Sequence, residues 1–78
     1  MDADKFKRLV GLNIEMKRKE KNLTQEKLAE KLGVTKRTVY NYEKGKNLDL
    51  ILFYHLSEIF NCNIEEFFLG FKTTHRGE

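Results

Sequence analysis

Five polar side chains that lie close together in the sequence could hydrogen-bond to the edges of nucleic-acid bases. They are Lys36, Arg37, Tyr40, Asn41 and Lys44. On a helix with about 100° per residue they fall within an arc of roughly 140°, while Val39 and Tyr42 fall on the opposite side and should be buried. Lysine and arginine can donate to O6 and N7 of guanine, and asparagine can pair with N6 and N7 of adenine. The pattern therefore predicts a helix whose exposed face reads duplex DNA.

The position of two of these cations favours a binding role over simple solvation of a helix face. Lys36 and Arg37 fall in the first turn of the predicted helix, where the helix dipole is positive. A cation that is merely exposed there costs about 0.3–1 kcal/mol. Contact with phosphates and bases would offset this cost, because the two cations would then be paired with DNA. A departure from the usual preference for acidic residues in the first turn, confined to one face of one helix, is typical of a functional site.

The elements that position this face form a helix-turn-helix pattern. Thr24 is the expected N-cap of a short helix, Gly33 ends that helix in a left-handed conformation, and Thr35 caps the next helix. Two short helices joined by a turn of three or four residues that contains glycine are typical of the motif. We expect the motif at about residues 24–43.

The rest of the chain also predicts helices, because it contains no proline and no strand-like alternation. The further helices cover about residues 4–20, 49–60 and 64–69. Asp49 is the expected N-cap of one, and Asn63 with Glu66 has the spacing of a capping box for the last. The predicted fold is all-α, with five helices in one compact domain over residues 1–70. Residues 71–78 are expected to form a short flexible tail.

Charge is divided unevenly along the chain. Residues 1–48 carry thirteen Lys or Arg against seven Asp or Glu, a net charge of +6, and residues 49–78 carry two against five, a net charge of −3. This segregation indicates that the first half faces a polyanion. Double-stranded DNA is the expected partner.

Composition argues against several other classes of protein. No apolar run approaches the roughly 20 residues of a membrane span, and the start of the chain lacks the order of a secretory signal. Cys62 is the only cysteine, which fits a reducing cytoplasm. Cys62, His55 and His75 do not have metal-ligand spacing, and no catalytic grouping is visible. We expect no metal, no cofactor, no small-molecule substrate and no enzymatic activity.

Residues 23–46, LTQEKLAEKLGVTKRTVYNYEKGK, closely resemble the helix-turn-helix of the phage Cro and lambda-repressor-like family, the Xre-type regulators. The residues that fall at the spacing of the family are Leu23, Gln25, Leu28, Ala29, Gly33, Val39, Glu43 and Gly45. The resemblance extends from about Phe6 to Leu69. It implies a five-helix domain that places its third helix in the major groove of operator DNA. It also implies a cytoplasmic, nucleoid-associated transcriptional regulator, expected to be a repressor, of a prokaryote or phage.

The resemblance implies roles for individual residues. Base-reading positions match Lys36, Arg37 and Asn41, with Tyr40 as a frequently used neighbour. Phosphate-contacting positions match Gln25, Thr38, Lys44 and Lys46. Arg18 and Glu43 match a buried ion pair between the first and third helices. Lys17 stands where many relatives have an aliphatic residue, so its stem is expected to pack while its amine contacts phosphate. Leu48 stands where many relatives have proline, which leaves the phosphate contacts of the 44–48 loop less defined.

The last two predicted helices carry more apolar residues than one core-facing stripe requires. We therefore expect a homodimer on a palindromic operator, because a single recognition helix reads only a few base pairs. The expected dimer interface consists of Phe67, Phe68, Leu69 and Phe71. The alternative is that a small domain uses most of these residues inside its own core.

A second class of function uses the same motif. Some relatives are antitoxins that bind a toxin and repress their own operon, and others are adaptors that bind a protein partner. The basic face of the third predicted helix argues against a pure adaptor. It leaves open an antitoxin that also binds DNA.

Overall fold

The computed structural model describes residues 2–70 of the chain, so the expected tail at 71–78, including Phe71, lies outside the described residues. The elements in order are α1 (Ala3–Glu20), α2 (Gln25–Leu32), α3 (Lys36–Glu43), α4 (Leu50–Phe60) and the 3₁₀ helix η1 (Ile64–Phe68). Within the described part there is no strand, which agrees with the predicted all-α class. No helix in that part is long and apolar enough to span a bilayer.

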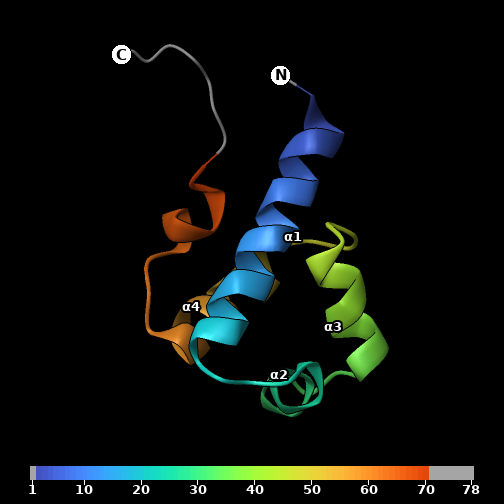
Figure 1. Ribbon diagram of the computed structural model, residues 1–78, viewed down its shortest axis with the longest axis vertical. Helices are drawn as coiled ribbons and strands as arrows, with labels where there is room; N and C mark the ends of the chain where they lie inside the picture. Colours follow the sequence, from blue (N-terminus) through green and yellow to red (C-terminus); the bar gives the residue numbers. More distant parts are fainter. Residues whose placement is uncertain (1, 71–78) are drawn as a thin grey trace.

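The long helix α1 runs through the middle of the molecule and separates α3 from η1 (Figure 1). Both of these elements pack against α1, while α4 contacts α2 and η1. The centre of the resulting core consists of side chains that are fully buried: Val10, Ile14, Leu28, Val39, Leu56 and Phe67. Each α-helix and η1 therefore contributes to a single core.

Local capping chemistry sets the helix ends where the sequence predicts them. The side chains of Thr24, Thr35 and Asp49 accept hydrogen bonds from backbone N–H groups in the first turns of α2, α3 and α4. At the other end, Gly33 (φ +74°) and Asn61 (φ +52°) adopt the left-handed conformation that ends α2 and α4. These predictions are confirmed.

The predicted fifth α-helix at residues 64–69 is a 3₁₀ helix instead, so the count of five α-helices is wrong for the described residues. The Glu66 side chain accepts from the Asn63 backbone N–H at 3.3 Å, which is one of the two hydrogen bonds of the predicted capping box. The helical segment behind it has only five residues, and Leu69 is already extended. Short segments favour the tighter 3₁₀ geometry because few i→i+4 hydrogen bonds can form.

The expected dimer interface on η1 is also wrong in part. Phe67 is fully buried, and its ring packs 5.6 Å from that of Phe53. The ring of Phe68 is half-buried between Phe6 and Phe53, with centroid distances of 5.7 and 5.6 Å. The small domain uses both rings to close its core, so aspartate at either position would test folding rather than dimerisation. Leu69 is exposed.

Polar contacts hold η1 against α1. The Asn13 side-chain amide donates to the backbone oxygens of Phe67 and Leu69, at 2.7 and 2.9 Å. Lys17 Nζ lies 2.8 Å from Glu66 Oε1. This hydrogen bond raises the pKa of Lys17 and lowers the pKa of Glu66. The last element is therefore fixed by specific contacts as well as by apolar packing.

The backbones of α1 and of the end of α3 approach each other closely at Gly11 and Gly45. A Cβ on Gly11 would lie 2.5 Å from the Glu43 backbone oxygen and 2.7 Å from the Gly45 nitrogen. Gly45 packs equally closely against α1, since a Cβ there would lie 2.6 Å from the backbone oxygen of Lys7. Only glycine lets the two backbones pack at this distance.

Gly11→Ala is therefore expected to lower the free energy of unfolding by about 1–3 kcal/mol, because the backbones must separate to admit the methyl group. Urea denaturation of the purified variant measures the change. Leu12→Ala is a matched control, since Leu12 is the next residue on α1 and is exposed. Equal stability of Gly11→Ala and the wild-type protein would contradict the close packing.

Candidate nucleic-acid interface

The two sides of α3 differ sharply in exposure. Val39 and Glu43 are buried against the rest of the domain, and Tyr42 is half-buried. The exposed side chains are those of Lys36, Arg37, Tyr40 and Lys44, with Asn41 and Thr38 half-buried at its edges. The sequence-predicted residues of this helix thus share one accessible face. No acidic residue lies in the first turn of α3.

The start of α2 completes this face. Gln25, the first residue of α2, lines one open hollow together with Lys36, Arg37 and Tyr40. We call these four residues and Asn41 the α3 face. It combines amide, cationic and phenolic groups, which can donate to and accept from base edges and phosphates.

A buried polar network supports the α3 face from behind. Arg18 Nε lies 2.6 Å from Glu43 Oε2, and Arg18 Nη2 lies 3.2 Å from Glu43 Oε1. Arg18 also donates to the Leu23 carbonyl oxygen, at 2.9 Å. The two charged residues are only 8% and 5% exposed. The ion pair that the resemblance implied is therefore present, and it joins α1 to α3.

Gln25 belongs to this network as well as to the surface. Its Nε2 donates to Glu43 Oε1 at 3.0 Å. One N–H and the carbonyl oxygen of the side-chain amide remain for other partners, since a carboxamide offers two donors and an acceptor. The contact fixes the start of α2 relative to the end of α3, and sequence reasoning did not find it.

Thr38 is tied to the cap of its own helix. Its hydroxyl lies 2.9 Å from the hydroxyl of Thr35, which also accepts from the Thr38 backbone N–H at 3.1 Å. A hydroxyl can both donate and accept, so Thr38 can form a further hydrogen bond.

Lys17 does not join the α3 face, so the structure gives no support to the expected phosphate contact of its amine. The amine pairs with Glu66 on η1, and the Lys17 side chain is only 19% exposed. Arg18, one residue later on α1, points to α3 instead. Figure 1 shows the reason, because α3 and η1 lie on opposite sides of α1.

The loop after α3 and the facing side of α1 carry a second group of cations. Lys46 lines a surface hollow with Lys7 and Asp4 of α1, and Gly45, Asn47 and Leu48 complete it. Asn47 has a positive φ of 59°, a conformation that asparagine tolerates better than most residues. Sequence reasoning missed Lys7. The spacing of Lys7 and Gly11 could have revealed its place, because residues four apart on a helix share one side, here the side of α1 that meets α3.

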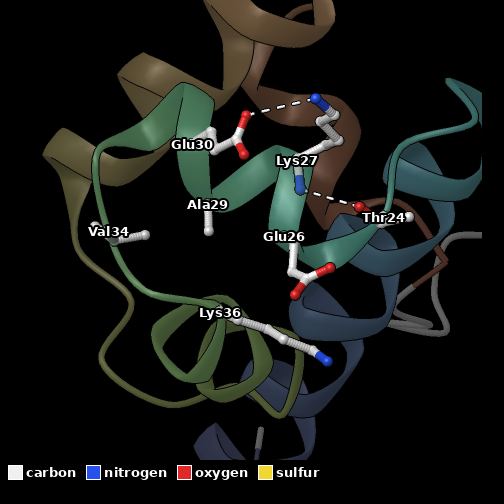
Figure 2. Close-up of a pocket in the computed structure, with 7 residues that line it drawn as sticks. All are labelled: Thr24, Glu26, Lys27, Ala29, Glu30, Val34 and Lys36. Carbon is white, nitrogen blue, oxygen red and sulfur yellow. Dashed lines mark hydrogen bonds and ion pairs between the residues drawn. The ribbon is translucent and has the colours of Figure 1, made fainter.

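An adjacent hollow between α2 and α3 has mixed charge. It is lined by Thr24, Glu26, Lys27, Ala29, Glu30, Val34 and Lys36. Figure 2 shows Glu26 and Lys36 reaching toward the same space from the two helices. Carboxylates repel phosphate, so this hollow marks the rim of the basic surface rather than its centre.

Metal and thiol chemistry find no support in the described part of the chain. There, no group of three or more His, Cys, Asp or Glu residues is placed to hold a metal ion. Cys62 is half-buried, and burial raises the pKa of its thiol, so the less reactive protonated form is favoured.

Two short helices joined through left-handed Gly33 and braced by α1 and α4 define a helix-turn-helix domain. A family model described as helix-turn-helix matches residues 14–67. The chain therefore belongs to this helix-turn-helix family, which is of the Xre and Cro type.

Curated relatives from archaea are similar to the motif and its surroundings. A protein of Archaeoglobus fulgidus named as an uncharacterized HTH-type transcriptional regulator is 45% identical over 49 residues, which are 62% of this chain and 69% of the relative. A second such protein of the same organism is 46% identical over 48 residues, 60% of this chain and 69% of the relative. One from Methanocaldococcus jannaschii is 45% identical over 49 residues, 62% of this chain and 74% of the relative. No solved structure matches the chain significantly.

Proposed function

We propose that this chain is a transcriptional regulator that binds duplex DNA in a sequence-specific manner through the α3 face. The observation that carries the proposal is the pair of cations, Lys36 and Arg37, in a first turn that has no acidic residue. They lie beside Tyr40 and Asn41 on an eight-residue helix whose other side is buried. A helix exposed in this way fits the major groove, where Arg and Lys select guanine and Asn selects adenine.

Phosphate contacts surround this base-reading centre in the proposal. Gln25 lies at the N-terminus of α2, where backbone N–H groups favour an anion. Thr38, Lys44 and Lys46 lie along α3 and the loop behind it. Each neutralised phosphate releases counterions, so the affinity should fall steeply as the salt concentration rises.

The proposed regulator acts as a repressor in the cytoplasm, in association with the nucleoid. A protein that occupies an operator excludes other proteins from the same DNA, so repression requires no further contact. The proposal assigns the chain no cofactor, no small-molecule substrate and no catalytic activity.

We further propose that two copies bind a palindromic operator and meet through α4. Leu50, Ile51 and Tyr54 are exposed apolar side chains on this helix, 75%, 65% and 56% exposed. Residues 49–70 contain four acidic residues and no Lys or Arg, so DNA is an unfavourable partner for this surface. A second copy of the chain is the partner that a two-fold symmetric DNA site supplies. Leu50 and Ile51 form the start of α4, separated from the 44–48 loop only by the N-cap Asp49, so a contact between these residues would bring the loops of both copies toward the operator centre.

Selection of bound sequences from a random duplex pool tests the proposed function when three proteins are compared. The wild-type protein should select one motif with dyad symmetry. Arg37→Ala should lose discrimination at one or two base pairs per half-site, by about 1–3 kcal/mol. Lys46→Ala should retain the motif, weaken binding to all sequences alike and flatten the salt dependence.

Arg37 and Lys46 are both exposed cations, so each variant controls for the charge lost in the other. Identical behaviour of the two variants would contradict the division between base and phosphate contacts. Sequence-blind binding by the wild-type protein, no stronger than that of an unrelated basic protein, would overturn the proposed function.

A further inference from the structure

The ring of Tyr40 contacts two cations, Arg37 on the same helix and Lys44 directly after the end of α3. The guanidinium carbon of Arg37 is 5.0 Å from the ring centroid, and Lys44 Nζ is 5.3 Å from it. Arg37 precedes Tyr40 by three residues and the C-cap residue Lys44 follows it by four, so the three side chains lie on one side. Both distances are within the roughly 6 Å over which a cation is attracted to the face of an aromatic ring.

The chemistry of this contact suits a cation that must later bind DNA. Among residues 2–70, neither Arg37 nor Lys44 forms an ion pair with a carboxylate. A carboxylate would occupy the N–H donors of these cations and would repel phosphate. A ring face attracts the cations while it leaves their donors available, and it carries no net charge.

We propose that Tyr40 is a positioning residue whose ring, rather than its hydroxyl, serves recognition. The ring restricts the rotamers of Arg37 so that its guanidinium stays close to the helix surface that enters the groove. It restricts Lys44 in the same way at the end of α3, next to the loop that carries Lys46. This role rests on the proposed function, and it replaces the base-reading role that the sequence indicates for the Tyr40 hydroxyl.

Tyr40→Phe and Tyr40→Leu separate the two roles. Affinities are measured for the selected duplex and for duplexes changed at the base pair whose discrimination Arg37→Ala loses. Tyr40→Phe should discriminate as the wild-type protein does. Tyr40→Leu should lose about two- to five-fold of the discrimination, the value of an exposed cation–π contact. In the Arg37→Ala background, Tyr40→Leu should cause no further loss at this base pair, because the ring acts through Arg37.

The contact between the Tyr40 ring and the two cations can also be tested in the absence of DNA. In the free protein, ring-current shifts of the Arg37 and Lys44 side-chain protons should persist in Tyr40→Phe and disappear in Tyr40→Leu. Tyr40 is 39% exposed, so both variants should fold, and thermal unfolding checks this.

Two results would overturn the positioning role, and a third would contradict the proposed function itself. Equal loss of discrimination in Tyr40→Phe and Tyr40→Leu would show that the hydroxyl reads a base and would overturn the positioning role. Full discrimination by folded Tyr40→Leu would overturn it as well. A wild-type protein that selects no sequence would contradict the proposed function, and it would remove the positioning role even if the ring-current shifts were present.

Discussion

Glu43→Gln is expected to lower the free energy of unfolding by about 3–5 kcal/mol, because it leaves the Arg18 charge buried without its counter-ion. Both side chains are almost inaccessible, and the pair is joined by two hydrogen bonds. Glutamine has nearly the same shape, so the loss reports the charge and one hydrogen-bond acceptor rather than a cavity. Urea denaturation at neutral pH measures it.

Two controls make this result specific. Glu30→Gln removes a carboxylate from an exposed pair with Lys27, and such pairs contribute about 0–1 kcal/mol. Arg18→Met combined with Glu43→Leu removes both charges and should recover much of the stability, since well-packed apolar residues often replace a buried ion pair without cost. A Glu43→Gln protein as stable as Glu30→Gln would contradict the structural role of the pair.

Ile51→Asp is expected to reduce affinity for the full palindromic operator by about 10²-fold or more, because binding loses the gain from two linked half-sites. Affinity for a single half-site should stay the same, since Ile51 lies on α4 and outside the α3 face. The side chain is exposed in the single chain, so the variant should fold. Titration of full-site and half-site duplexes, with sedimentation of the free protein, measures both effects.

Leu12→Asp is the matched control for this prediction. Leu12 is an exposed apolar residue on α1, with 53% exposure against 65% for Ile51. If Leu12→Asp separated the copies and Ile51→Asp did not, the interface would lie on α1. A selected site without dyad symmetry, together with a wild-type protein that stays monomeric, would contradict the dimer. The α4 surface would then fit a different protein partner, as in the antitoxin alternative.

Features set by local chemistry could be predicted from the sequence, whereas contacts between distant residues mostly could not. The starts of α2, α3 and α4 depend on a hydroxyl or a carboxylate, and the ends of α2 and α4 on a glycine and an asparagine; these predictions are confirmed. The Arg18–Glu43 pair spans 25 positions, and only the family resemblance indicated it. The Gln25–Glu43 hydrogen bond had no sequence signal of its own.

The errors have a common physical cause. The sequence favours surface roles for Lys17 and Phe67, but the surroundings of both residues depend on where η1 folds back. Both residues face this contact between α1 and η1, where Lys17 Nζ lies 5.6 Å from the centre of the Phe67 ring. An apolar surplus in the sequence does not tell which phenylalanine closes the core and which aliphatic residue remains exposed. Over residues 49–70 the exposed large apolar residues are Leu50, Ile51 and Tyr54 on α4, together with Leu69.

The division of α3 into a buried and an exposed side has a consequence for how binding specificity can change. The contacts that hold the helix in place involve Val39 and Glu43, whereas Lys36 and Arg37 contribute no core contact. Residues at positions 36 and 37 can therefore be exchanged at little cost in stability, since exposed substitutions usually change it by less than about 0.5 kcal/mol. The same scaffold could then acquire a new target sequence through a few substitutions, in natural divergence or in the laboratory. Exchanges at position 40 should alter how strictly Arg37 discriminates rather than which base it prefers.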